Sequence, residues 1–227
     1  MPKNRIENLA DGVFAILVTI LTLDLKVPSF QEIRSDEEFL HILSEFGFIL
    51  LIYFISFAVL SSYWLSHHFI ISVFAKNADR LLSHFNLLFL STVSLIPFSS
   101  YLLGLYPGNK ISVFIFAANV IVIGLSLILL RWHVNKSREI ENKELSQSEF
   151  TKSLIHLSLP PVFAVFAIFF AFISPEWALV FFVIPTLLNI IPNSFEIMLK
   201  LMRKLVSMFT RGHEKRPFNI GRENKKV

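Results

Sequence analysis

The sequence predicts an all-α membrane protein with six transmembrane helices per subunit and both termini in the cytoplasm. The first observation behind this prediction is composition. Of the 227 residues, 54% are hydrophobic, and the mean hydropathy of +0.61 exceeds that of an ordinary soluble domain. The second is the presence of six apolar runs, each near the length of about 20 residues that crosses a bilayer. The third is the distribution of lysine and arginine among the loops.

The first apolar run is bracketed by two acids, Asp11 and Asp24, with twelve uncharged residues between them. It spans a membrane, over about Asn8–Val27, only if an acid lies at membrane depth or in the interface. Such acids are costly and usually face a bundle interior or a water path, so an ion pathway is the first hypothesis. Because acids precede the run and no small-residue cleavage site follows before Asp24, we interpret it as a retained span rather than a signal peptide.

Five further runs are long enough to cross a membrane, and three of them contain proline. Proline kinks a transmembrane helix but is tolerated where neighbouring helices satisfy the backbone again. The runs are Phe46–Leu65, Phe85–Leu105 with Pro97, Ile111–Leu130, Leu154–Ile173 with Pro160 and Pro161, and Trp177–Phe195 with Pro185 and Pro192.

Basic residues are concentrated in alternate loops, as the positive-inside rule requires. With the N-terminus in the cytoplasm, 18 of the 21 lysines and arginines lie inside, and only Lys26, Arg34 and Lys110 lie outside. Both termini inside requires an even number of spans. The sequence therefore predicts a six-span channel domain over residues 1–199 and a basic cytoplasmic tail, partly disordered, over residues 200–227.

Two charged segments flank the spans. The first outer loop, Asp24–Glu38, holds five acids and two bases, so it is either an acidic vestibule that attracts cations or a solvated loop without a role. The tail, Lys200–Val227, holds nine bases and two acids. We expect the tail to contact anionic lipid of the inner leaflet, and we expect no nucleic-acid binding because it has no recognisable motif.

Three stretches carry a recognisable signature. Arg5 precedes Asp11–Ile16, which reads Asp-Gly-Val-Phe-Ala-Ile. Tyr63–His68 reads Tyr-Trp-Leu-Ser-His-His, and Asn86–Leu90 is followed by Pro97-Phe98. In these stretches the sequence resembles the transmembrane protein 175 family of potassium channels, although Leu9 and Ala10 replace the phenylalanine and serine of the family pattern.

The resemblance implies a homotetramer whose first helix lines a central pore with an apolar constriction. It implies that Ile16 forms the narrowest ring, that Thr19 supplies the hydroxyl linked to selectivity, and that Ile20 and Leu23 add apolar layers. These four residues recur at three- and four-residue spacing, so they form one helical stripe, which on its own is more typical of ordinary helix packing than of a pore. No TVGYG-like stretch is present, which excludes a carbonyl filter of that type, and hydrophobic constrictions can gate by dewetting.

A second group of residues predicts a structural polar network rather than an ion site. Asp11 needs hydrogen-bond donors, and the candidate partners are Arg5, Trp64, His67 and Asn86, with Trp64 and His68 on one helical face. Adjacent histidines point about 100° apart, which disfavours a metal site, whereas a pH-sensing role is chemically plausible. His156 is a lone histidine near the start of a span, and we interpret it as structural.

Enzyme motifs such as HExxH, GxSxG, a Walker loop and GxGxxG are absent, so we expect no enzyme and no cofactor beyond the permeant potassium ion. We expect a multi-pass protein of the cell (inner or plasma) membrane that conducts potassium passively, with weak to moderate selectivity. One alternative is a proton-conducting channel or proton-coupled transporter with Asp11 and His67 as relay groups. The other is a non-transporting scaffold whose basic tail recruits partners or lipid.

Overall fold

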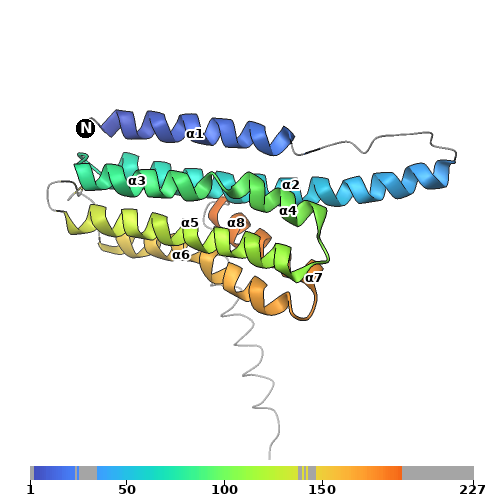
Figure 1. The fold of residues 1–227 in the computed structure, drawn as a ribbon. Helices are drawn as coiled ribbons and strands as arrows, with labels where there is room; N and C mark the ends of the chain where they lie inside the picture. Colours follow the sequence, from blue (N-terminus) through green and yellow to red (C-terminus); the bar gives the residue numbers. More distant parts are fainter. Residues whose placement is uncertain are drawn as a thin grey trace, which may run out of the picture. The chain divides into compact units, whose positions relative to one another are not determined.

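A computed structural model of the chain describes residues 3–23, 25, 35–137, 140, 142 and 147–190. Apart from a single bridge residue, all regular secondary structure in these ranges is helical, which confirms the predicted all-α class (Figure 1). The elements are α1 (Lys3–Leu23), α2 (Asp36–Phe69), the π-helix η1 (Ile70–Phe74), α3 (Arg80–Val93), α4 (Ile96–Leu105), α5 (Lys110–Lys136), α6 (Gln147–Phe170), α7 (Pro175–Ala178) and α8 (Val180–Ile190).

Helix α1 begins five residues before the predicted span and has one buried stripe. The buried residues are Ile6, Ala10, Phe14, Leu17 and Leu21, whose spacing of three and four places them on one side of a helix. This side packs on α2, α3 and α4. Asp24 and most of the first outer loop lie outside the described residues, so the predicted vestibule stays a prediction.

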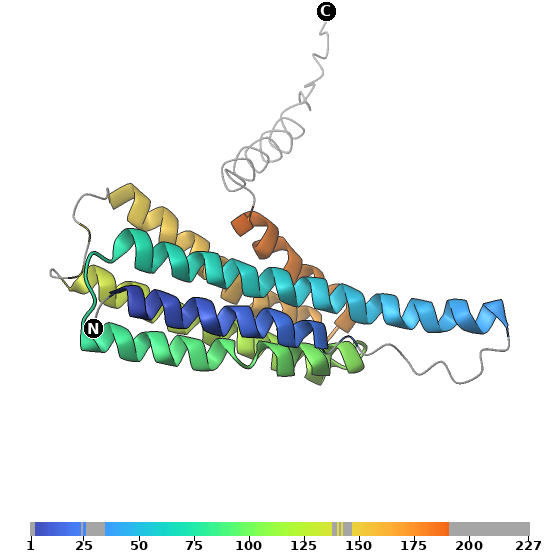
Figure 2. The ribbon, with the colours of Figure 1, turned by 90° about the horizontal axis from the view of Figure 1, so that it is seen from above.

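Helix α2 is much longer than the run of apolar residues that predicts it. Its 34 residues extend over about 50 Å, whereas the hydrocarbon core of a bilayer is about 30 Å thick. The N-terminal turns of α2 consequently project beyond the neighbouring helices (Figure 2). At the other end α2 continues into η1, where the Ala75 amide donates to the Ile70 carbonyl at 3.1 Å.

The third predicted span is interrupted, because it consists of α3 followed by α4. The Asp79 side chain caps the start of α3 by accepting from the Leu82 amide at 2.6 Å. Pro97 lies in the first turn of α4, where a residue without an N–H is tolerated. The two helices together still form a candidate span, Arg80–Leu105.

Helix α5 is the central element of the second half of the chain. It packs on α3 and α4 on one side and on α6 on the other, and the Tyr63 hydroxyl of α2 donates to the Val120 carbonyl at 2.7 Å. Gly124 allows the closest approach to α6: a Cβ atom at this position would lie 2.8 Å from the ring of Pro161. The α5–α6 contact therefore depends on the missing side chain of Gly124.

Four of the described helical segments are long and apolar enough to cross a membrane: Lys3–Leu23, Ile42–Phe74, Arg80–Leu105 and Lys110–Lys136. The chain is therefore a multi-pass membrane protein. In the regions of the predicted fifth and sixth spans, the apolar helical stretches are shorter: His156–Phe170 and Pro175–Leu188. The six-span count therefore stays a prediction. Residues 191–227, which include the end of the predicted sixth span and the whole basic tail, lie outside the described residues.

Candidate pore-lining face and polar network

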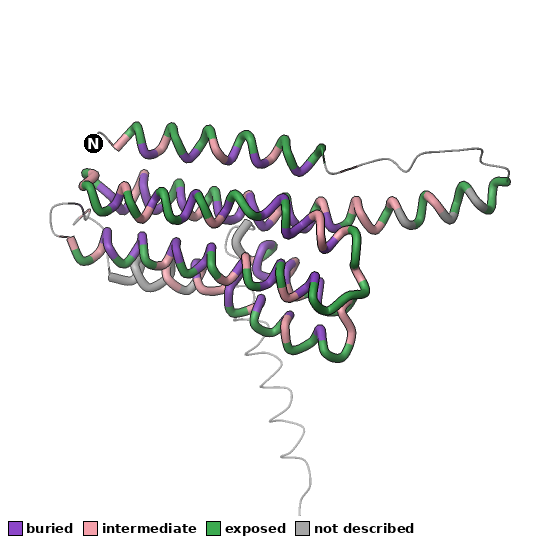
Figure 3. Tube along the Cα trace, in the orientation of Figure 1, coloured by how far each residue is buried: buried purple, intermediate pink, exposed green. Residues whose placement is uncertain are grey.

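The four predicted pore residues share the exposed face of α1, opposite the buried stripe. Ile16 is 59% exposed, Ile20 36% and Leu23 74%, and Thr19 is also exposed. In Figure 3 the exposed positions of α1 face away from the other helices. Ile16 and Leu23 keep more than half of their surface exposed, whereas Ile20 is largely covered within the subunit, so this apolar face is only partly used for packing within the subunit.

Thr19 has a hydroxyl whose proton is already engaged. Its Oγ1 donates to the Ile16 carbonyl at 2.7 Å, a common interaction of threonine within helices. A hydroxyl oxygen keeps lone pairs when it donates its single proton. The oxygen of Thr19 can therefore accept a hydrogen bond or coordinate a cation on the exposed side of α1.

Towards the N-terminus the same face of α1 becomes more polar. Asn8 and Gly12 are exposed, and a Cβ atom added to Gly12 would meet no other atom within 4 Å. Leu9 lies seven residues before Ile16 and is also 43% exposed, so bulky apolar side chains recur along this face and are most frequent from Ile16 onward.

Asp11 lies at the edge between α1 and α2 and binds Trp64. The indole Nε1 donates to Asp11 Oδ1 at 2.9 Å, and the Trp64 ring stacks on His68 with centroids 5.8 Å apart. Asp11 itself is exposed in the subunit. It follows Ala10 of the buried stripe by one position, and the rotation of about 100° between neighbouring residues carries it away from the core.

His67 and Asn86 form the buried part of the network. His67 Nε2 and Asn86 Oδ1 are 2.7 Å apart, so the histidine donates when Nε2 carries the proton. The His67 ring also lies flat against the Phe89 ring, with centroids 5.0 Å apart. The ring centroids of Phe89 and Phe14 are 6.0 Å apart. This cluster links α2, α3 and the buried side of α1.

Arg5 does not join either group. It is exposed, and among the described residues no hydrogen bond or ion pair connects it to the network. Sequence reasoning also missed Phe14 and Phe89 as members of the cluster. Phe89 could have been identified from the sequence, because it follows Asn86 by three residues and therefore lies on the same side of α3. Among the described residues no group of three acids or histidines could hold a metal ion.

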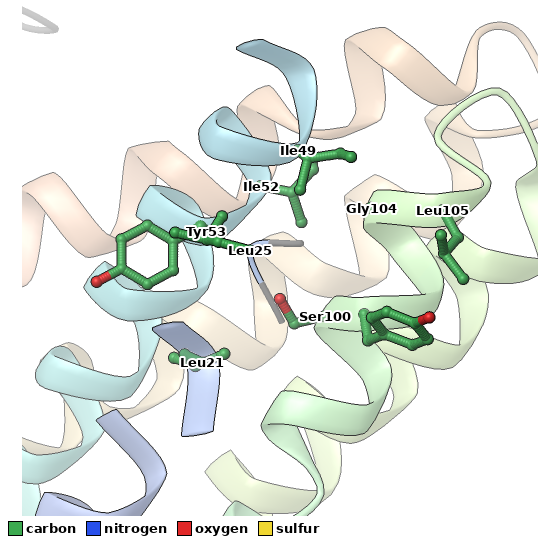
Figure 4. A pocket seen from close by; sticks show the side chains of 9 residues that line it. Leu21, Leu25, Ile49, Ile52, Tyr53, Ser100, Gly104 and Leu105 are labelled. Atoms are coloured by element: carbon green, nitrogen blue, oxygen red, sulfur yellow. The ribbon is translucent and has the colours of Figure 1, made fainter. Parts of the chain in front are cut away.

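A cavity of about 90 Å³ lies behind the C-terminal end of α1, on the side away from the candidate pore face. Figure 4 shows Leu21 of α1, Ile52 and Tyr53 of α2, and Ser100 and Gly104 of α4 around it. The Ser100 hydroxyl donates to Ser56 Oγ at 2.6 Å.

Comparisons with known proteins place the chain among ion channels. The family model described as endosomal/lysosomal potassium channel TMEM175 matches residues 5–97. A potassium channel of Chryseobacterium sp. (strain P1-3) is 30% identical over 85% of this chain and 95% of its own length. The crystal structure of a lysosomal potassium-selective channel TMEM175 homolog from Chamaesiphon minutus superposes with a TM-score of 0.66 and 25% identity, over 82% of this chain and 95% of the other. The endosomal/lysosomal proton channel TMEM175 of Gallus gallus is 34% identical over 43% of this chain but only 20% of its own length.

Proposed function

Because this chain belongs to the TMEM175 family, which is a family of ion channels rather than of enzymes, we propose that it forms a potassium-conducting cation channel. Four copies surround a pore lined by the exposed face of α1. Its relative in Chryseobacterium is named a potassium channel, and its homolog in Chamaesiphon is called potassium-selective. Conduction is passive, and the selectivity for potassium over sodium is weak to moderate.

The observation that carries the proposal is the exposed apolar stripe of α1. A large exposed apolar face usually marks an interaction site. In a symmetric oligomer, the same face of each copy can meet around the axis. Ile16 and Leu23 are seven residues apart, which is about 10 Å along a helix. Rings of Ile16, Ile20 and Leu23 would form an apolar constriction of that length, which can close by excluding water.

Thr19 interrupts the apolar rings with a ring of oxygens. Because its proton points to the Ile16 carbonyl, the lone pairs of Thr19 remain for a partly dehydrated ion. Four such hydroxyls would replace part of the hydration shell of the ion within the constriction. This arrangement supports Thr19 as the residue that distinguishes potassium from sodium.

For the topology we propose six spans with both termini in the cytoplasm of a cell (inner or plasma) membrane. Two contacts bring basic segments to the end where α1 begins (Figures 1 and 2). Lys3 Nζ donates to the Ser72 carbonyl at 3.0 Å, and the Lys76 amide donates to the Ile140 carbonyl at 2.7 Å. A basic end of this kind favours the cytoplasmic side. We propose that residues 1–199 form the channel domain and that the basic tail, residues 200–227, contacts inner-leaflet lipid.

A second candidate function is proton conduction. The relative in Gallus gallus is named a proton channel, and the Asp11–Trp64 and His67–Asn86 contacts lie on neighbouring turns of α2 beside α1. In this alternative Asp11 and His67 relay protons, and potassium does not move.

The deciding experiment is ion flux from liposomes that contain the purified protein. We expect potassium flux to exceed sodium flux, and Ile16→Asn to raise it because a polar ring wets more easily. The matched control is Leu125→Asn, which changes an exposed residue of similar size on α5 and should leave flux unaltered. Unchanged flux in Ile16→Asn would remove this residue from the constriction. Proton flux alone would favour the relay, and no flux from folded protein would favour a non-transporting scaffold.

A further inference from the structure

Helix α5 carries an unbroken exposed stripe from one end to the other. The spacing between successive exposed residues alternates between four and three positions. We call this set of residues the α5 stripe. Its members are Ile111, Ile115, Ala118, Val122, Leu125, Leu129, Trp132 and Lys136. The remaining faces of α5 pack on α3, α4 and α6, and α1 is not among the principal neighbours of α5. The stripe therefore lies apart from the candidate pore face.

The apolar part of the α5 stripe has the length of a bilayer core. Ile111 and Trp132 are 21 residues apart, which is about 32 Å along a helix, and the hydrocarbon core is about 30 Å thick. Lys110 precedes this stretch and Lys136 follows it. The match places Trp132 at the level of the lipid headgroups, where tryptophan is enriched.

Trp132 and Lys136 form one outward-facing pair at this end. Trp132 is 52% exposed, and Lys136 Nζ lies 4.8 Å from the centre of its ring. The neighbouring bases on α5 are directed elsewhere: the buried Arg131 guanidinium lies over the Phe74 ring at 3.6 Å, and His133 Nε2 lies 2.9 Å from Asp79 Oδ2. The Asp79 carboxylate is thus engaged by His133 on another face of α5, and the pair presents a single positive charge beside an indole.

We propose that Trp132 and Lys136 bind the headgroup of an anionic phospholipid. The phosphate accepts from Lys136, the indole lies beside the glycerol region, and an acyl chain runs along the α5 stripe. This assignment requires that α5 spans the membrane, and it does not depend on which ion the protein conducts. It uses only the described helix α5 and not the basic tail.

Lipid suits this surface better than a second copy of the chain. Helix interfaces in membranes are enriched in small residues that let backbones approach, whereas the α5 stripe has Ala118 as its only small member. A protein contact would also remove Lys136 from water, which is unfavourable without a carboxylate partner. A phospholipid supplies both the apolar chain and the negative charge.

The test is titration of the purified full-length protein with phosphatidylglycerol or phosphatidylcholine, with bound lipid counted by native mass spectrometry. We expect Lys136→Gln to weaken phosphatidylglycerol binding about fivefold, the effect of one lysine at an anionic surface, and Lys136→Arg to restore it. Phosphatidylcholine binding should not change. The matched control is Lys110→Gln at the opposite end of α5. We expect a smaller loss there because the carboxylate of Glu176 lies beside Gly108, two residues before Lys110.

A second measurement tests whether lipid rather than protein covers the stripe. The contribution of Trp132 to the tryptophan fluorescence is the difference between the wild type and Trp132→Phe. We expect this contribution to be quenched in vesicles made with brominated acyl chains. An unquenched Trp132 signal would assign the stripe to a contact between copies and overturn the proposal. Equal losses in Lys136→Gln and Lys110→Gln, or equal binding of both lipids by the wild type, would also overturn it.

Discussion

The contact between His67 and Asn86 allows the polar network to be tested apart from ion conduction. We expect Asn86→Leu to destabilise the protein, because it leaves the His67 donor unsatisfied in a buried site. His67→Phe keeps the ring that stacks on Phe89 and leaves the amide of Asn86 unsatisfied instead. The double variant replaces both partners with apolar groups, so we expect it to be less destabilised than the two single losses combined.

The magnitude follows from the burial and length of this bond. His67 is 2% exposed and Asn86 1%, and the bond of 2.7 Å cannot be replaced by water without rearrangement. An unsatisfied buried donor or acceptor costs about 1–3 kcal/mol, while measured coupling between helices in membranes averages about 0.6 and reaches about 1.7 kcal/mol. We expect a coupling of about 1 kcal/mol, a factor of about five in the unfolding equilibrium.

The assay is unfolding in mixed micelles with increasing sodium dodecyl sulfate, followed by loss of helical circular dichroism, for the wild type, both single variants and the double variant. The control cycle uses Thr92→Val and Ser126→Ala, whose hydroxyls are 3.3 Å apart and should couple less strongly. Strictly additive losses at His67 and Asn86 would show that their contact does not hold α2 to α3.

Three further changes test other parts of the reasoning. Thr19→Val removes the oxygen that we assign to the ion, so it should lower the potassium-to-sodium permeability ratio; an unaltered reversal potential would reject that role. Asp11→Ala should reduce the yield of assembled oligomer, seen by size-exclusion chromatography, more than it alters selectivity, and a stable oligomer without selectivity would reverse the assignment. Gly124→Ala brings a Cβ to 2.8 Å from Pro161, and overpacking of about 1–3 kcal/mol should exceed the gain of about 1 kcal/mol in helix propensity. Gly104→Ala, whose Cβ would have its nearest neighbour at 4.0 Å, should not lose stability in the same unfolding assay.

Several features of the site could be predicted from local sequence alone. The spacing of Ile16, Thr19, Ile20 and Leu23 puts them on one face of any helix, and the structure leaves that face exposed. Trp64 and His68 are likewise four residues apart and stack. Whether the face lines a pore is a property of the assembled oligomer, so that assignment stays a proposal.

Other features depended on how the helices pack. The partner of Asp11 is 53 residues away and the partner of His67 is 19 residues away, so no helical periodicity could select them. Arg5, which the sequence groups with them, has no hydrogen bond or ion pair with them among the described residues. The division of the third span into α3 and α4 was also missed, because a proline in an apolar run fits a kink and a break equally well.

The sequence by itself determined the class, most of the membrane-crossing helices and the register of the α1 face, because run length and helical period are properties of neighbouring residues. Tertiary structure decided that Asp11 meets Trp64 at an exposed edge and that His67 meets Asn86 in the core. It also decided that one face of α5 remains open from Ile111 to Lys136. These outcomes depend on which helix faces are covered by others, and only the packing of distant segments determines that.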